Sequence, residues 1–66
     1  MTITINGQQR RIEESTTLAD VLEEFGTPAR GVAVAVDGAV VPRASWPRTQ
    51  LRPEATVEIL TAVQGG

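Results

Sequence analysis

Residues 32–38 read VAVAVDG, in which three valines alternate with two alanines ahead of an Asp-Gly pair. Alternation with a period of two is typical of a β-strand, and valine is among the residues most enriched in strands. Both alternating sets are apolar, so we expect a strand with apolar residues on both faces. Asp37-Gly38 predicts a tight turn, after which Val40 and Val41 form a short extended piece. Pro42 keeps that piece out of a central position in a sheet, because proline cannot donate a ladder hydrogen bond.

The segment before this strand predicts a helix. Thr17 is a capping residue, and Asp20 three positions later completes a sequence that resembles a capping box. The acid also suits the partial positive charge at a helix N-terminus. Four apolar residues then recur at i, i+3, i+4 and i+7, which places them on one core-facing stripe: Leu18, Val21, Leu22 and Phe25. Gly26 ends the predicted helix, with Pro28 beyond it.

The N-terminal residues predict a β-hairpin. Ile3 and Ile5 alternate with polar residues, and Asn6-Gly7 joins the two residue types that best tolerate a positive φ. Residues 8–12 would form the returning strand. A looser loop at Asn6-Gly7 is the alternative, but the turn chemistry favours the hairpin.

The final strand is predicted at residues 56–61, with Val57 and Ile59 on one face and Glu58 and Leu60 on the other. An irregular stretch should precede this strand. The predicted order is strand, strand, helix, strand, short strand, strand. One helix packed on a mixed sheet of four to five strands gives an α+β fold with a single two-layer core.

The composition describes one small soluble domain that lacks the usual catalytic side chains. The chain has 66 residues, of which 41% are hydrophobic and 21% charged, with a net charge of −2. That charge argues against nucleic-acid binding. The absence of cysteine and histidine removes disulfides, the soft metal ligands and the commonest general base. Because the usual catalytic side chains are missing, we expect a protein that is not an enzyme. Because there is no signal segment and no apolar run long enough for a membrane span, we expect it in the cytoplasm.

The Gly65-Gly66 pair at the end of the sequence is the feature that carries chemistry. Two residues without Cβ can adopt strained conformations and thread a narrow channel, which suits a reaction at the carboxylate of Gly66. A carboxylate becomes a good electrophile when a partner uses ATP to form an acyl-adenylate, and a sulfur nucleophile could then produce a thiocarboxylate. The chain has no lysine whose amine could attack such a group, although a genome biased towards arginine explains that absence equally well. The alternative is an ordinary frayed terminus.

Several segments together resemble the ThiS family, the sulfur carriers of thiamine biosynthesis. They are the order of elements, residues 32–38, Val41-Pro42-Arg43 with Trp46, and the closing Val63-Gln64-Gly65-Gly66. The resemblance covers nearly the whole chain. One departure is Pro53-Glu54-Ala55, where relatives usually carry a Gly-Asp turn.

The resemblance implies a ubiquitin-like β-grasp fold, with a single domain over residues 1–61 and a flexible Gly-Gly tail over residues 62–66. It implies that a ThiF-like enzyme adenylates Gly66, which becomes a thiocarboxylate and delivers sulfur to a ThiG-like thiazole synthase. Gly65 would be the second essential tail residue. The chain itself would bind no cofactor, because the activating partner uses the ATP, and it would bind neither metal, nucleic acid nor membrane.

Partner binding is expected at an apolar patch opposite the helix and along the tail, at Ala33, Ala35, Leu60, Val63 and Gln64. Trp46 either covers the core, which we favour, or anchors a partner. The helix acids Asp20, Glu23 and Glu24 are interpreted as a solvated face rather than a paired-carboxylate site.

Other functions remain as alternatives, among them a protein modifier that forms covalent adducts with lysines of other proteins. The chain could resemble the small subunit of molybdopterin synthase, or another sulfur carrier, although those small subunits are usually longer and have prolines before their terminal glycines. It could also be a non-catalytic β-grasp interaction module, since a fold alone does not fix function.

Overall fold

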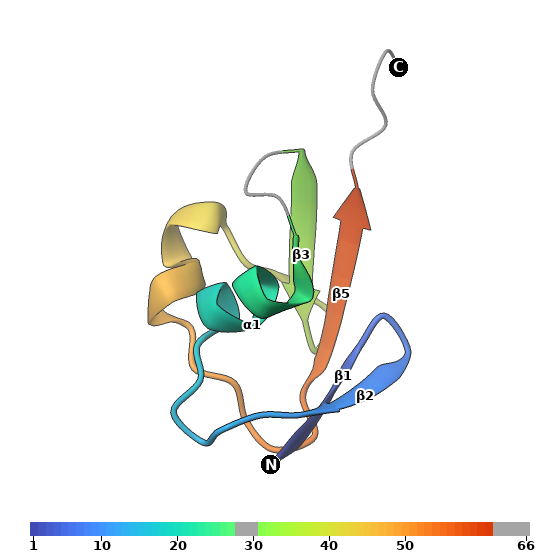
Figure 1. The fold of residues 1–66 in the computed structure, drawn as a ribbon. Helices are drawn as coiled ribbons and strands as arrows, with labels where there is room; N and C mark the ends of the chain where they lie inside the picture. The colour runs from blue at the N-terminus through green and yellow to red at the C-terminus, as the bar shows by residue number, and fades with distance from the viewer. Residues whose placement is uncertain (28–30, 62–66) are drawn as a thin grey trace.

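The computed structural model describes residues 1–27 and 31–61, which form one mixed sheet, one α-helix and one 3₁₀-helix (Figure 1). In chain order these elements are β1 (Thr2–Ile5), β2 (Gln8–Arg11), α1 (Leu18–Phe25), β3 (Val32–Val36), β4 (Ala39–Val40), η1 (Arg43–Arg48) and β5 (Thr56–Thr61). The predicted α+β order is therefore confirmed.

The turn between β1 and β2 is a two-residue hairpin turn. Asn6 and Gly7 have φ values of 48° and 82°, the positive angles that a type I′ turn requires at both central positions. The hairpin is closed at its far end by Met1 and Ile12, whose backbones exchange hydrogen bonds of 2.9 Å and 2.8 Å. The looser-loop alternative is therefore wrong.

Helix α1 begins and ends where its capping residues predict. The backbone N–H of Asp20 donates to the side-chain oxygen of Thr17, and the N–H of Thr17 donates to the Asp20 carboxylate, each over 3.2 Å. These reciprocal bonds form a capping box and satisfy donors that would otherwise lack a partner. Gly26 ends the helix in the left-handed conformation with φ 81°.

Strand β5 lies in the middle of the sheet, whose order is β2-β1-β5-β3-β4. It runs parallel to β1, with Ile5 opposite Val57, and antiparallel to β3, with Val34 opposite Ile59. Helices α1 and η1 lie side by side against one face of the sheet (Figure 1). Pro42 follows β4 at the sheet edge, as its missing N–H predicts.

The core lies between this sheet face and the two helices. Its buried members are Ile3, Ile5, Leu18, Val21, Leu22, Val34, Trp46, Leu51, Ala55 and Val57. Trp46 is 7% exposed, and its indole N–H donates to the backbone oxygen of Val41 over 3.0 Å, so the polar end of the ring is satisfied. The prediction that Trp46 covers the core is confirmed, and a role as an exposed partner anchor is not.

Two segments differ in detail from the sequence-based expectation. The stretch expected to be irregular contains η1, a 3₁₀-helix that includes Pro47. The short strand β4 begins at Ala39, one residue earlier than predicted. On β3, Val34 is buried and Ala33 is exposed as expected, because both helices lie on the valine side of the sheet and leave the alanine side open to solvent (Figure 1).

Candidate functional site

The predicted reactive group lies beyond the described part of the chain. The predicted tail over residues 62–66 is outside the described residues. It includes the predicted site residues Val63, Gln64, Gly65 and Gly66. The structure describes strand β5, which ends at Thr61 and directly precedes these residues in the sequence. Strand β5 points to the end of the molecule opposite the N-terminus (Figure 1).

An apolar patch covers part of the sheet face that the helices leave open. Leu60 of β5 is paired with Ala33 of β3, and Val40 of β4 is paired with Ala35. Side chains of directly paired residues lie on the same face of a sheet, so these four residues share one surface. Leu60 is 64% exposed and Val40 is 72% exposed. We call Ala33, Ala35, Val40 and Leu60 the apolar patch.

The other half of the same face is polar. Thr4 of β1 is paired with Thr56 at the beginning of β5. An open hollow on this half is lined by Thr2, Thr4, Gln9 and Glu54. The apolar patch is therefore confined to β3, β4 and the last part of β5, which is the part that leads to residues 62–66.

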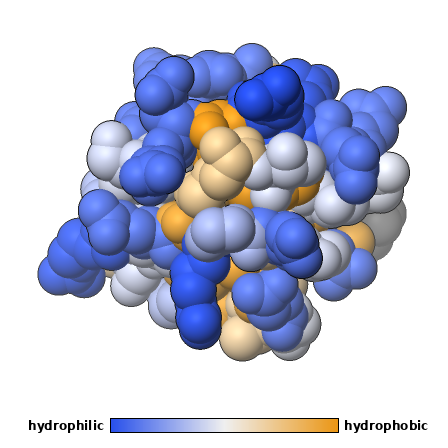
Figure 2. Space-filling model, turned by 90° about the horizontal axis from the view of Figure 1, so that it is seen from below, coloured by the Kyte–Doolittle hydropathy of each residue, from blue (hydrophilic) through white to orange (hydrophobic). Residues whose placement is uncertain are grey.

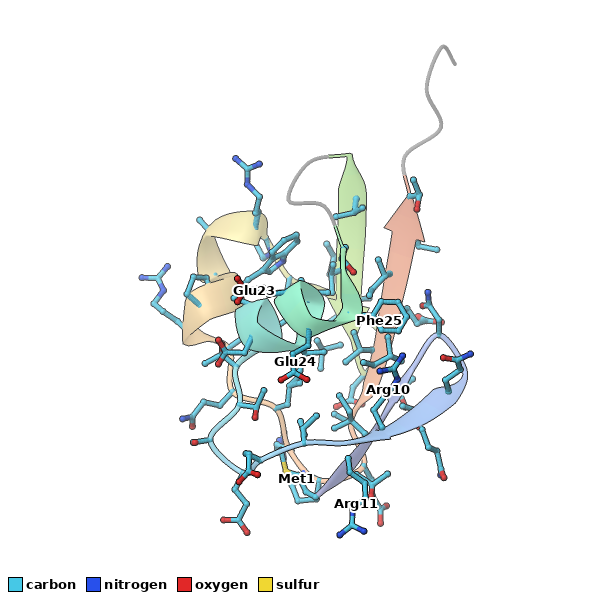
Figure 3. All side chains as sticks on the ribbon, viewed as in Figure 1. Met1, Arg10, Arg11, Glu23, Glu24 and Phe25 are labelled. Carbon is cyan, nitrogen blue, oxygen red and sulfur yellow. The ribbon has the colours of Figure 1, made fainter. Side chains whose placement is uncertain are left out.

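The charged residues singled out from the sequence do not form a second site. The helix acids Asp20, Glu23 and Glu24 are exposed, and within residues 1–27 and 31–61 no group of acidic side chains is placed to hold a metal ion. Figure 3 shows Glu23 and Glu24 on α1. The interpretation of these acids as a solvated face is confirmed.

Arg10 and Arg11 lie on opposite faces of β2, so they do not combine into a basic patch. Arg10 is paired with the buried Ile3, whereas Arg11 is paired with Thr2. The guanidinium carbon of Arg10 lies 4.9 Å from the centre of the Phe25 ring, within the range of a cation–π contact (Figure 3). This contact covers Phe25, which is only half-buried at the edge of the core.

An open hollow of about 810 Å³ lies at the opposite end of the molecule from the last residue of β5. It is lined by Met1, Arg11, Ile12, Glu13, Glu14, Ser15, Thr16 and Glu24. Figure 2 views this end and shows hydrophilic side chains around a few apolar ones. Throughout the described residues, every buried side-chain nitrogen or oxygen has a hydrogen-bond partner, so the hollow has no buried unpaired polar atom to hold a ligand.

No α-helix within the described ranges has both the length and the hydropathy needed to cross a bilayer.

The structure brings together all three patch residues predicted within the described chain and adds one that the sequence reading missed. Ala33, Ala35 and Leu60 were predicted from strand alternation alone. Val40 was not predicted. The two-residue turn at Asp37-Gly38 fixes Val40 opposite Ala35, so the turn signal in the sequence could have identified it.

A mixed five-stranded sheet around a central strand, with one α-helix on one face, defines a small ubiquitin-like β-grasp domain. The profile of the ThiS family matches residues 3–66. The chain therefore belongs to the ThiS family.

Solved structures support the same assignment. The chain superposes on the crystal structure of a thiamine biosynthesis protein (ThiS) from Geobacter metallireducens with a TM-score of 0.86 and 28% identity, over 100% of both chains. An NMR structure of a thiamine biosynthesis protein from the same organism gives a TM-score of 0.77 and 28% identity, over 100% of this chain and 88% of the other.

Two curated relatives differ greatly in length. The sulfur carrier protein ThiS of Thermus thermophilus is 37% identical over 62 residues, which are 94% of this chain and 95% of that protein. A thiazole synthase of Paramagnetospirillum magneticum is 32% identical over 66 residues, which are all of this chain but 20% of that protein. That thiazole synthase therefore contains a segment similar to the whole of this chain.

Proposed function

We propose that this chain is a sulfur carrier of thiamine biosynthesis whose reactive group is the carboxylate of Gly66. The observation that carries the proposal is the family match, which extends through residue 66 and so includes Gly65-Gly66. The similarity to the sulfur carrier protein ThiS of Thermus thermophilus over nearly the full length of both proteins supports it.

The proposed chemistry has three balanced steps. First, the Gly66 carboxylate attacks the α-phosphorus of ATP, which forms an acyl-adenylate and releases pyrophosphate. Second, a hydrosulfide equivalent attacks the acyl carbon and AMP leaves, which gives the thiocarboxylate. Third, the sulfur replaces a carbonyl oxygen of the acceptor, and that oxygen returns to Gly66 as carboxylate.

The partners divide this chemistry among them. We propose a ThiF-like enzyme for the adenylation, with ATP bound to that enzyme, so that the carrier is a co-substrate and binds no cofactor itself. A ThiG-like thiazole synthase would be the acceptor of sulfur. The thiazole synthase that contains a segment similar to this chain supports a functional link between the two modules. We place these steps in the cytoplasm, where ATP is available.

The apolar patch is the docking surface that best fits this role. It holds two large side chains that are mostly exposed, Leu60 at 64% and Val40 at 72%, and it adjoins the end of β5. Burial of both by a partner would remove apolar surface from water, at about 25 cal/mol for each Å². We propose that this surface holds the partner while Gly65 passes into its channel, with Val63 and Gln64 as further tail contacts.

Intact-mass spectrometry of the protein from its native host tests the proposal. Cells starved of thiamine should contain a fraction of the chain in which sulfur replaces one oxygen, and alkylation should shift the mass of that fraction alone. A recombinant sample made without the activating enzyme is the control and should show only the carboxylate. Finding only the carboxylate in starved cells that contain the activating enzyme would contradict the proposal.

A further inference from the structure

The side chain of Asn6 is hydrogen bonded twice to the backbone of Ile59, 53 residues away along the chain. The N–H of Ile59 donates to Asn6 Oδ1 over 2.8 Å, and Asn6 Nδ2 donates to the carbonyl oxygen of Ile59 over 3.3 Å. One amide group therefore satisfies both the donor and the acceptor of a single residue of β5.

This amide continues the ladder between β1 and β5 after β1 has ended. The N–H groups of Thr4 and Asn6 donate to the oxygens of Ala55 and Val57, each over 2.9 Å, as successive bonds of a parallel ladder. The next bonds would join Ile59 to the backbone of β1. The chain, however, turns into β2 at Asn6, where φ is 48°. The side-chain amide, which has the same donor and acceptor as a peptide group, takes their place.

Ile59 is a sensitive place for such a contact, because it precedes Leu60 of the apolar patch and lies two residues before the end of β5. Successive residues of a strand direct their backbone groups to opposite sides. Val57 and Ile59 therefore face β1, whereas Leu60 faces β3, where it is paired with Ala33. Without the Asn6 amide, the β1 side of β5 would lose its attachment beyond Val57.

We propose that Asn6 is a positioning residue that fixes the orientation of the last residues of β5, with Leu60 of the apolar patch among them. The inference rests on the proposed function. A strand end held on both sides offers the activating enzyme one orientation of the apolar patch. A strand end held on one side must be ordered during binding, which costs affinity. We call the two hydrogen bonds between the Asn6 amide and the Ile59 backbone the clamp. The clamp therefore affects docking of the carrier and leaves the chemical step unchanged.

The second hairpin of the molecule supplies a matched control. Asp37 and Gly38 have φ values of 51° and 87°, so this turn has the same geometry as Asn6-Gly7. The Asp37 carboxylate accepts a hydrogen bond of 2.9 Å from the N–H of Thr56, so this residue also contacts β5 from a turn. Thr56, however, is the first residue of β5, at the end of the strand far from the tail.

The test compares Asn6→Gly with Asp37→Gly in full-length carrier. Glycine keeps the positive φ of each turn without strain and removes only the side-chain bonds. Adenylation would be measured as ATP–pyrophosphate exchange catalysed by the ThiF-like enzyme of the same organism, at several concentrations of the carrier. Asn6→Gly should raise KM for the carrier by about 5- to 10-fold with kcat unchanged, because only docking is weakened. Asp37→Gly should change KM by less than about twofold. Hydrogen exchange should show faster exchange of the Ile59 amide only in Asn6→Gly.

The outcomes separate this inference from the function on which it rests. If the unmodified carrier is not adenylated, the proposed function fails and the inference falls with it. If the unmodified carrier is adenylated and Asn6→Gly has the same KM although the Ile59 amide exchanges faster, only the positioning role is overturned. Equal increases in KM for both variants would also overturn it, because a general loss of stability would then explain the effect.

Discussion

Glu54 adopts a backbone conformation that suits glycine better than glutamate. Its φ is 66°, and it is the third residue of a turn in which the N–H of Ala55 donates to the oxygen of Arg52 over 3.1 Å. Pro53 at the second position and a positive φ at the third are the features of a type II turn. A residue with a Cβ in the left-handed region costs about 1–2 kcal/mol.

Replacement of Glu54 by glycine should therefore stabilise the protein. Glycine relieves the left-handed strain but loses more entropy on folding, so Glu54→Gly should raise the free energy of unfolding by about 0.5–1 kcal/mol. Urea denaturation would measure the change. The matched control is Glu58→Gly, because Glu58 lies within β5. There glycine should lower the free energy of unfolding by about 0.5–1 kcal/mol. A loss of stability in both variants would refute the strain at Glu54.

This residue shows what a sequence can and cannot predict at the finest scale. Pro53-Glu54-Ala55 departs from the pattern that the resemblance to the ThiS family leads us to expect, so the sequence predicts an altered loop geometry. It does not give the φ of Glu54, because that angle also depends on the bond of 2.7 Å that the Glu54 N–H donates to the oxygen of Thr2. Such a bond joins residues far apart in the chain.

Substitutions on the sheet face opposite the helices should weaken partner binding without lowering the stability of the fold. Leu60→Glu introduces a charge into the apolar patch, and because Leu60 is already 64% exposed, little folding energy is lost. Binding to the ThiF-like enzyme, measured by calorimetry, should weaken about tenfold or more, since an unpaired charge would be buried in an apolar contact. The melting temperature should shift by less than about 2 °C.

Thr56→Glu is the matched control for that substitution. Thr56 is exposed on the same face of the same strand, but it lies opposite Thr4 in the polar half. It should leave binding within about twofold of the unmodified carrier. If both variants weakened binding equally, the effect would come from net charge, and the patch would not be the docking surface.

The elements that the sequence predicted well are those with local signals. Thr17 and Gly26 bracket α1 through contacts within a few residues, and Asn6-Gly7 forms its turn through its own backbone preferences. The 3₁₀-helix η1 has no such signal. It is held by short-range bonds such as Ser45 N–H to the oxygen of Pro42 over 2.8 Å, and Pro47 within it indicates a break in any helical pattern.

The part of the candidate site that follows from the alternation of side chains along a strand was predictable from the sequence. A period of two places Leu60 opposite the core-facing side of β5, and the same rule applies to Ala33 and Ala35. The clamp between Asn6 and Ile59 was not predictable, because the sequence marks Asn6 as a turn residue and does not indicate a partner 53 residues away. Strand order, which only the fold supplies, brings the two together.

At the scale of the whole molecule, stability and proposed reactivity are located in different parts of the chain. Every buried residue of the described chain is apolar, and these residues form one core. Val57 is fully buried at its centre, with 0% exposure. The proposed reactive group, at Gly66, lies outside the described residues, so none of the described core contacts involves it.

Deletion of Gly65-Gly66 and the substitution Val57→Ala should therefore have opposite effects. The deletion should leave the melting temperature unchanged, because terminal glycines have no side chain to bury, but it should abolish adenylation in ATP–pyrophosphate exchange. Val57→Ala should lower the free energy of unfolding by about 1–3 kcal/mol through lost burial and a cavity. Below its melting temperature, however, Val57→Ala should be adenylated at a normal rate, because the carboxylate and the tail are unchanged.

A third variant separates the length of the tail from its shape. Gly65→Val keeps the terminal carboxylate but adds a β-branched side chain, which restricts the backbone and widens the chain where the enzyme must admit it. It should block adenylation without lowering the melting temperature, whereas Thr61→Val, the same side chain at the exposed end of β5, should permit it. Normal adenylation of both the truncated chain and Gly65→Val would show that Gly66 is not the reactive residue, and an interaction module would then explain the fold better.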